Sequence, residues 1–428
     1  DAIEIKKLFD LLNPFVQLKF YSFSLLNCSL VDTPTSHQVF DLDKKICNCL
    51  GKLTLSAYSS ENQREDLSLK EIIYSALFAM KCLSETPILF DNINKQLFGE
   101  DSYVHFVNLL ERMKVALRAD KNIDTKYNVQ FFSLLENLSC TFEDMSLNAD
   151  IVDKLIKLFI IPDCKDYPTL WSVSKLLEIC IDSDESLAAF ENAGGLTFLQ
   201  KRLNKEIDFC LENPNMNEGV EYYIKINYTL NFKQIFFLKY ILQLFLTIIN
   251  LNPCDEIKNK LDNSILNTLN KILLNINTFG FTLVSVGLNI VTALLYKEPG
   301  FFEILKKAGT ISIVLDSFQN IAGSYSFLWL ASTEVVSAIC SNKDGLQDFI
   351  SKNILHYLFE PLKNVELSKD LIGGPHRDYI RVLEEMYNDH LELQKSLEDE
   401  FLKILNDFDR GEYEQNIFME DKNGNYFD

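Results

Sequence analysis

The cysteines at positions 47 and 49 are the residues whose type and spacing come closest to those of a metal site. A pair of thiolates can bind a soft metal, but structural zinc sites take four ligands. The sequence has no second cysteine pair at zinc spacing, and its histidines form no His-Glu-x-x-His pattern. The five histidines are at positions 37, 105, 356, 376 and 390. We therefore expect no metal-binding residues and interpret Cys47 and Cys49 as reduced, buried or half-buried thiols.

No spacing typical of nucleotide binding or of nucleophilic catalysis is present. Gly51-Lys52 is followed by Leu53 and lacks the earlier glycine of a phosphate-binding loop. The nucleophile pattern Gly-x-Ser-x-Gly is absent, and nothing in the sequence brings two carboxylates together in one pocket. We therefore expect no catalytic residues, no cofactor-binding residues and no cofactor. An enzyme contained wholly in these residues is the least favoured of the functional hypotheses.

The composition of the 428-residue chain favours helices. A hydrophobic content of 47% is enough to form a core, which excludes general disorder. The 15 glycines and 10 prolines are few for this length, whereas all-β folds need frequent turn residues. Ten cysteines without a paired spacing indicate reduced thiols rather than a disulfide framework. We therefore predict a mostly helical protein of the cytoplasm, the nucleus or both.

The charge balance limits the kinds of partner. With 61 acidic and 41 basic residues the formal net charge is −20, which repels nucleic acid and anionic lipid surfaces. The most apolar stretch, 235–251, contains Lys239, Gln243 and Asn250, whereas a membrane span takes ~20 residues with few or no charges. We predict a buried helix at this stretch, and we expect neither direct nucleic-acid binding nor membrane binding.

An internal repeat is the clearest sign of organisation. The segment 176–196 has a counterpart at 291–311, which lies 115 residues further along and aligns without a gap. A third copy, 335–355, follows after 44 residues. A period of ~40–47 residues is typical of helical HEAT and armadillo arrays.

The three copies agree on where a short helix starts. Pro299 suits the first helical position, where its missing N–H would have been unpaired, so Glu298 is predicted as the N-cap. The equivalent residues, Ser183 and Asn342, can each accept a hydrogen bond from an otherwise orphaned backbone amide. Each helix also carries two apolar residues three apart, which predicts one inward stripe. These pairs are Leu187 and Phe190, Phe302 and Leu305, and Leu346 and Phe349.

The copies also agree on where this helix stops. Gly194, Gly309 and Asn353 are of the residue types that tolerate the left-handed conformation at the end of a helix. A helix of about three turns is marginal in water, so each must pack against the helices before and after it. We therefore predict an all-α fold, an armadillo/HEAT-like α-solenoid in which stacked helical repeats form a superhelix.

Four regions are predicted along the chain. They are armadillo-like repeats at 1–200, an insertion with a long apolar helix at 201–260, further armadillo-like repeats at 261–408, and an acidic, poorly ordered tail at 409–428. The long apolar helix of the insertion is predicted to run from about Tyr222 to Asn250, after a mobile loop at 212–219. The last helix before the tail is amphipathic and carries Leu397, Phe401, Leu402, Ile404 and Leu405.

The two tryptophans test for one particular class of armadillo protein. Nuclear-import armadillo proteins present a tryptophan with an asparagine four residues later. Here Trp171 is followed by Lys175, and Trp329 by Thr333. That pattern is absent, and we expect both tryptophans in the core.

Several runs of residues resemble one known family. The runs 190–196 (FENAGGL) and 202–208 (RLNKEID) resemble the N-terminal armadillo-repeat region of the giant HECT-type E3 ubiquitin ligases, the HUWE and Tom type. The runs 277–280, 297–299 and 307–309 resemble that family's helix ending in Phe-Gly, its Glu-Pro helix start and its Glu-Ala-Gly turn.

The resemblance extends over most of the chain, from about residue 15 to residue 408. Upstream, 25–29 and 41–43 resemble the family's early Leu-Glu-Asn-Cys helix and its Asp-Leu-Asp helix entry. Two departures stand out: lysines at 306 and 307 replace the usual acidic residue before Ala-Gly, and Gly309-Thr310-Ile311 replaces Gly-Leu. Different local contacts are expected at these positions.

The resemblance implies a noncatalytic scaffold. The family's catalytic cysteine lies in a C-terminal HECT domain that no part of this sequence resembles, so no catalytic residue is carried over. The implied role is to recruit protein substrates and position them for a HECT module in the same parent chain. The acidic balance predicts a preference for basic segments, weakened by salt. The alternative is a free-standing armadillo/HEAT adaptor or transport receptor that binds protein segments.

Overall fold

The computed structural model describes residues 51–52, 54–55, 73–74, 76–78, 80–81, 100–120, 123–140, 149–161, 163–213, 232–252, 263–321, 326–363 and 374–410. Within these ranges every regular element is an α-helix, and the all-α prediction is confirmed. The chain divides into two compact units, Asp1–Leu196 (unit 1) and Thr197–Asp428 (unit 2).

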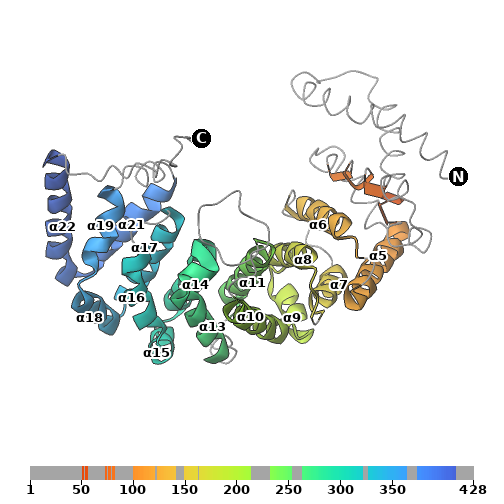
Figure 1. Ribbon diagram of the computed structural model, residues 1–428, viewed down its shortest axis with the longest axis horizontal. Helices are drawn as coiled ribbons and strands as arrows, with labels where there is room; N and C mark the ends of the chain where they lie inside the picture. The colour runs from red at the N-terminus through yellow and green to blue at the C-terminus, as the bar shows by residue number, and fades with distance from the viewer. Residues whose placement is uncertain are drawn as a thin grey trace, which may run out of the picture. The chain divides into compact units, whose positions relative to one another are not determined.

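The described part of unit 1 is built from helices that pack against near neighbours in the sequence. Its helices are α5 (Glu100–Ala119), α6 (Thr125–Cys140), α7 (Ala149–Phe159), α8 (Tyr167–Cys180) and α9 (Asp184–Asn192). Helix α6 packs against α8, and α7 packs against α5, α8 and α9 (Figure 1). Each helix therefore contacts elements one or two places away in the sequence, as in a stacked array.

The core of unit 1 combines aromatic stacking with buried hydrogen bonds. Tyr127 stacks on Phe131 within α6, with ring centroids 5.8 Å apart. Beside them, Asn128 donates from Nδ2 to the Thr169 hydroxyl oxygen at 3.1 Å, and Thr169 donates to Asp166 Oδ2 at 2.6 Å. Because an unpaired buried polar group costs ~1–3 kcal/mol, these bonds fix α6 against α8.

Most of the described helices belong to unit 2. Helix α10 starts two residues before the boundary between the units. The helices are α10 (Gly195–Glu212), α11 (Phe232–Leu251), α13 (Asn263–Leu274), α14 (Ile276–Lys297), α15 (Gly300–Lys307), α16 (Thr310–Ile321), α17 (Ser326–Cys340), α18 (Lys343–Lys352), α19 (Leu355–Lys363), α21 (Gly374–Asp389) and α22 (Leu391–Arg410).

Four helices of unit 2 form a row that we call the ladder. These are α11, α14, α17 and α21, each of which packs against the next (Figure 1). Helices α13, α15 and α16 pack behind α14 and α17, and α18 and α19 contact α17. This consecutive packing of neighbours is that of an α-solenoid, which confirms the predicted fold class. The armadillo or HEAT subtype stays a prediction.

Two described helices are long and apolar enough to cross a membrane by length and composition, Lys233–Leu251 of α11 and Ile276–Lys297 of α14. In unit 2 these helices pack against each other, and α14 also packs against α13 and α17. Apolar side chains on several sides of α14 are buried, among them Leu283, Val286 and Ile290. A helix that is apolar nearly all round suits a position between other helices.

The predicted helix start at Ser183 is confirmed. Ser183 caps α9 in a reciprocal arrangement: its hydroxyl oxygen accepts from the Ser186 amide at 3.3 Å, and its own amide donates to the Ser186 hydroxyl oxygen at 3.2 Å. Asn342, the counterpart in the third copy, accepts from the Asp344 amide at 2.9 Å. Both residues thereby satisfy amides that lack an intrahelical partner.

The predicted N-cap at Glu298 is displaced by one residue. Helix α15 begins at Gly300, with Pro299 at the N-cap position. The amides of Phe301 and Phe302 donate to the carbonyls of Glu298 and Pro299, at 3.1 Å each. These bonds link residues three apart and tighten the first turn to 3₁₀ geometry, so the regular α-helix begins later than the sequence suggested.

The predicted helix stops are confirmed. Gly194, Gly309 and Asn353 all have positive φ, at 78°, 79° and 51°. The inward pairs are confirmed as well, because all six apolar side chains of the three short helices are buried. All three short helices thus end at a residue with positive φ and bury one apolar stripe, as the repeat predicted, whereas only α9 and α18 have a side-chain N-cap.

Several other predictions meet the structure only in part. Trp329 is fully buried, whereas Trp171 is half-buried. Helix α11 is described from residue 232, and the predicted earlier part from Tyr222 lies outside the described residues, as do the loop at 214–219 and the tail beyond residue 410. The division of the chain at residues 200, 260 and 408 stays a prediction.

Candidate functional site

The reactive side chains of the described residues are dispersed or buried. No group of three or more His, Cys, Asp or Glu side chains among them could hold a metal ion. The thiols at positions 164, 180, 210 and 340 are buried and form no disulfide. Burial raises the pKa of Cys210 to about 12, with a further contribution from Glu206, so this thiol stays protonated and unreactive. Cys47 and Cys49 lie outside the described residues.

The exposed side of the ladder instead brings together an acidic cluster from neighbouring helices. Arg381 of α21 is at its centre: its Nη1 lies 2.9 Å from Glu385 Oε1 and its Nη2 lies 3.6 Å from Glu334 Oε1 of α17. Asp378, one turn before Arg381 on α21, is exposed. Three carboxylates therefore surround one guanidinium, and we call these four residues the acidic ladder cluster.

The electrostatics of this cluster follow from partial burial and like charges. Desolvation raises the pKa of Glu334. The nearby negative charges of Asp378 and Glu385 raise this pKa further, whereas the positive charge of Arg381 lowers it. The hydrogen bond that Arg381 donates to Glu385 raises the pKa of Arg381, which keeps the guanidinium charged. The carboxylates exceed the guanidinium by two charges, so a further cation is attracted to this surface.

An aromatic side chain extends the cluster onto a third ladder helix. Tyr296 near the end of α14 is 55% exposed and interacts with Ser337 of α17. Partial burial raises the pKa of the Tyr296 phenol, and the nearby charges of Glu385 and Glu334 raise it further. A tyrosine ring beside carboxylates can take the side chain of a lysine or arginine through cation–π and ionic contacts together.

The run 202–208, which carries part of the family resemblance, has a structural role on one side of α10. Arg202 Nη2 lies 2.8 Å from Glu206 Oε1, with both side chains 6% exposed. Gln234 of α11 donates from Nε2 to Glu206 Oε2 at 3.1 Å, and the Arg202 guanidinium lies over the Phe237 ring at 5.3 Å. These contacts fix α10 against α11.

The opposite side of the same run faces α13. Thr268 donates a hydrogen bond to Asn204 Oδ1, and Lys271 Nζ lies 2.5 Å from Asp208 Oδ1. Because 202 and 206 lie on one side of a helix and 204 and 208 on the other, the run joins α10 to two neighbours. The run thereby holds α10 against α11 and α13.

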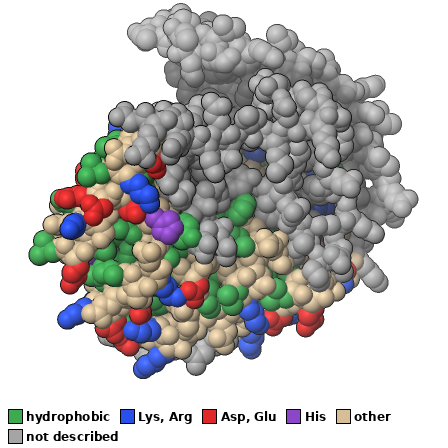
Figure 2. Space-filling model, turned by 60° about the vertical axis from the view of Figure 1, so that its left-hand side comes forward, with side chains coloured by type: hydrophobic (Ala, Val, Ile, Leu, Met, Phe, Trp, Pro, Cys, Tyr) green, Lys and Arg blue, Asp and Glu red, His purple; other side chains and the backbone are tan. Residues whose placement is uncertain are grey.

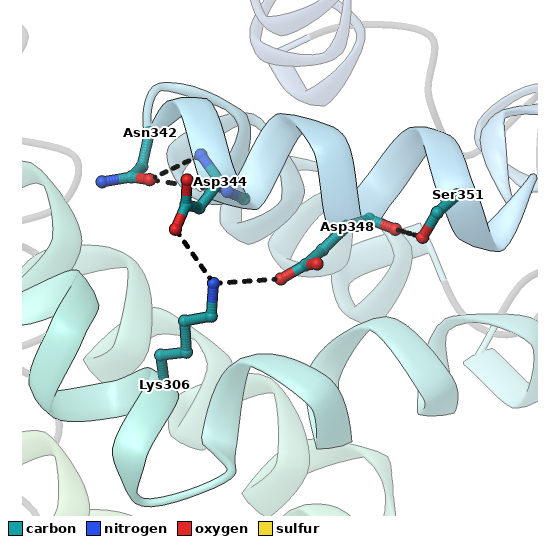
Figure 3. A network of polar contacts seen from close by, with 6 residues as sticks. Lys306, Asn342, Asp344, Asp348 and Ser351 are labelled. Atoms are coloured by element: carbon teal, nitrogen blue, oxygen red, sulfur yellow. Dashed lines mark hydrogen bonds and ion pairs between the residues drawn. The ribbon is translucent and has the colours of Figure 1, made fainter.

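The lysine that departs from the family pattern forms a bridge between two repeats. Lys306 at the end of α15 reaches α18, where its Nζ lies 3.2 Å from Asp344 Oδ2 and 3.7 Å from Asp348 Oδ2 (Figure 3). The hydrogen bond with Asp344 raises the pKa of Lys306. Asn342 caps the same helix end that receives the lysine, so the cap and the bridge share one turn.

The residues of the acidic ladder cluster were not identified from the sequence. Glu334 and Arg381 stand 47 positions apart in the sequence, and no motif links them. A weak signal exists: Glu334 interrupts the otherwise apolar 327–340, and polar residues within buried helices often face a neighbour. Their convergence depends on how α17 packs against α21.

Comparison with known proteins adds an independent line of evidence. A family model described as a domain of unknown function, DUF913, matches residues 172–373. The probable E3 ubiquitin-protein ligase TOM1 of Eremothecium gossypii is 30% identical over 397 residues, which cover 90% of this chain and 12% of that protein. The E3 ubiquitin-protein ligase TOM1 of Saccharomyces cerevisiae is 28% identical over 400 residues, which cover 92% of this chain and 12% of that protein.

A more distant relative gives the same result. The mouse E3 ubiquitin-protein ligase HUWE1 is 23% identical over 334 residues, which cover 73% of this chain and 7% of that protein. The chain thus spans only a small part of each relative's length.

The fold defines the class of the described residues as an all-α solenoid region. The sequence-based recognition is confirmed by these relatives: the chain belongs to the family of giant HECT-type E3 ubiquitin ligases of the TOM1 and HUWE1 type, and corresponds to a region of them.

Proposed function

We propose that this chain is a noncatalytic armadillo-repeat scaffold of a HECT-type E3 ubiquitin ligase. It recruits protein substrates and positions them for ubiquitin transfer by a HECT module of the same parent chain. The family relationship supports the link to ubiquitin transfer. The observation that carries the scaffold role is the acidic ladder cluster, a partly desolvated charged surface on stacked helices.

The substrates that fit this surface are proteins with exposed lysine- or arginine-rich segments. The excess of carboxylates over the Arg381 guanidinium attracts cations, and Tyr296 adds an aromatic face. The formal net charge of −20 acts in the same direction over a longer range. Proteins, rather than nucleic acids or membranes, are therefore the proposed direct partners, and no cofactor takes part.

We propose that the chain works in the cytoplasm, the nucleus or both. The four buried cysteines among the described residues form no disulfide, which suits a reducing compartment. Fractionation of cells that express the tagged parent ligase would test this location, and recovery in a secretory compartment would contradict it.

The decisive experiment removes the charge of the cluster in the full-length parent ligase. The test variant combines Glu334→Gln, Asp378→Asn and Glu385→Gln, which keep side-chain size. The control variant combines Glu185→Gln, Glu212→Gln and Glu303→Gln, three exposed acidic residues outside the cluster that remove the same total charge. Ubiquitin transfer to core histones, used as a basic substrate, is measured at two ionic strengths beside ubiquitination of the ligase itself.

We expect the test variant to lose transfer to histones while self-ubiquitination continues, and the control variant to retain both. The loss should be largest at low salt, because screening weakens exposed charge pairs. Equal histone transfer by the test and control variants would overturn the proposed role of the cluster. A parent chain that transfers no ubiquitin would favour the free-standing adaptor.

A further inference from the structure

Helix α22 has a wide apolar face, and neighbouring helices cover only one part of it. It packs against α19 and α21, and Leu393, Leu397 and Ile404 are buried there. Four other large apolar side chains of this helix stay exposed. They are Leu391 (79% exposed), Phe401 (49%), Leu402 (55%) and Leu405 (47%). The sequence predicted a single amphipathic face, but the structure buries only part of it.

The exposed apolar residues of α22 lie on one side of the helix. At 3.6 residues per turn, Leu391, Phe401, Leu402 and Leu405 fall within an arc of ~100°. They extend over 15 positions, which corresponds to roughly 21 Å along the axis. We call this surface the α22 stripe. Figure 2 turns forward the left-hand side of Figure 1, where α22 lies, and shows hydrophobic side chains at the surface among acidic and basic ones.

A carboxylate is held within the α22 stripe. Glu398 falls in the same arc, between Leu391 and Phe401. Tyr387 of α21 donates its phenolic O–H to Glu398 Oε1 at 2.6 Å, and the Tyr387 carbonyl accepts from Gln394 Nε2 at 2.9 Å. Among the residues that the structure describes, no lysine or arginine pairs with Glu398. The carboxylate is therefore oriented but not neutralised.

Acidic side chains outnumber basic ones around the stripe, and the exposed Lys395 lies at its edge. Helix α22 carries six acidic and three basic residues. Glu392 and Asp399, next to Leu391 and Glu398, are both exposed. A partner that covers the stripe must bring positive charge, since a like charge placed opposite a carboxylate is repelled.

We propose that the α22 stripe binds an amphipathic helix of a partner protein, with an apolar ridge that covers Leu391, Phe401, Leu402 and Leu405 and a lysine or arginine that pairs with Glu398. An apolar face of this length is that of a helix that binds along a helix. The excess negative charge argues against a second copy of α22, which would place carboxylates opposite carboxylates, and against an anionic membrane.

This inference does not depend on the ubiquitin role. The α22 stripe shares no residue with the acidic ladder cluster, and its test measures binding alone. Failure of one proposal therefore leaves the other standing.

The probe is a synthetic helical peptide of about 18 residues, long enough to cover the stripe. It carries leucines at every third or fourth position and lysines on both borders of that ridge. A matched peptide has glutamate in place of each lysine. Binding of fluorescently labelled peptides to the 428-residue chain is followed by anisotropy. We expect the lysine peptide to bind at least tenfold more tightly than the glutamate peptide.

Two variants locate the binding. Leu402→Asp should weaken binding of the lysine peptide by about tenfold or more, as expected for an apolar residue at the centre of an interface. Leu274→Asp on α13, where Leu274 is 63% exposed, is the matched control and should leave binding unchanged. Glu398→Lys should weaken binding of the lysine peptide and strengthen binding of the glutamate peptide. This change of sign cannot arise from partial unfolding, and circular dichroism checks the helix content of each variant.

Three results would overturn the proposal. The first is equal binding of the two peptides. The second is an equal loss of lysine-peptide binding in the Leu402→Asp and Leu274→Asp variants. The third is a dimer in sedimentation experiments that Leu402→Asp dissociates, since a second copy would then be the occupant.

Discussion

Arg202 and Glu206 form a buried ion pair one helical turn apart on α10, with 2.8 Å between Nη2 and Oε1. Gln234 occupies the second oxygen of the carboxylate, and the Phe237 ring covers the guanidinium. A buried charge whose partner is removed cannot return to water without opening the helix contact. The pair is therefore a point at which α10 and α11 depend on each other.

Glu206→Ala should lower the free energy of unfolding by ~3–5 kcal/mol, because it leaves the Arg202 charge buried without its carboxylate. Urea denaturation of the 428-residue chain, followed by circular dichroism, measures the change. Asp208→Ala is the control two residues away: its ion pair with Lys271 is exposed on both sides and should contribute at most ~1 kcal/mol. Similar losses in the two variants would contradict the special role of the buried pair.

Replacing both members of the pair tests the same point from the other direction. Arg202→Met combined with Glu206→Leu removes both charges and should cost much less than Glu206→Ala alone, because no unpaired charge remains. A double variant as unstable as the single one would show that packing, rather than charge, governs this site.

Alanine substitutions at Gly345 and at Gly287 should have opposite effects on stability. An ideal Cβ at Gly345 would lie 2.2 Å from the Ile339 carbonyl oxygen, so the backbone must shift. Gly345→Ala should destabilise unit 2 by about 1–3 kcal/mol or more. At Gly287 the nearest atom, Leu273 Cδ2, would be 3.6 Å away, an ordinary contact. Gly287→Ala should therefore stabilise α14 by ~0.5–1 kcal/mol. Thermal unfolding of both variants measures the two changes in stability. Stability changes of the same sign would contradict the packing inferred at these glycines.

The contribution of Asp316 should depend on pH in the acidic range. The hydrogen bond from Lys352 lowers the pKa of Asp316 below its ordinary 3.8. A lowered pKa in the folded state stabilises the fold above the unfolded pKa, and this stabilisation is lost as the pH falls through the folded pKa. Wild type should exceed Asp316→Asn in stability at pH 7, and the two should converge below about pH 3. A difference that persists unchanged at acidic pH would exclude the ion pair as its cause.

The Lys306 bridge between α15 and α18 should show the salt dependence of an exposed ion pair. Lys306→Met removes the charge and keeps the aliphatic chain beside Phe302, over whose ring the ammonium lies at 5.5 Å. We expect a lower unfolding midpoint at low salt and no difference at ~1 M salt, where charges are screened within ~3 Å. Lys307→Met, at the neighbouring exposed lysine, is the control and should have little effect at either salt concentration. If the Lys306→Met deficit survives high salt, packing rather than charge is responsible.

Local chemistry made the short repeat helices predictable. The caps at Ser183 and Asn342 and the positive φ at Gly194 and Asn353 depend on hydrogen bonds and backbone sterics within a few residues, so residue type alone indicates them. The start of α15 was misplaced by one residue because a 3₁₀ turn and an N-cap with proline look alike in sequence.

The binding surfaces were decided by tertiary structure. Glu334 and Arg381 meet because α17 packs against α21, and the only local signal for that contact is the weak one of a glutamate within the apolar 327–340. Likewise, the sequence showed α22 as amphipathic, but only the packing determined that Leu397 is buried and Leu402 exposed. Hydrophobic periodicity indicates that a helix has an apolar side. How much of that side the neighbouring helices cover depends on the angle at which the helices pack.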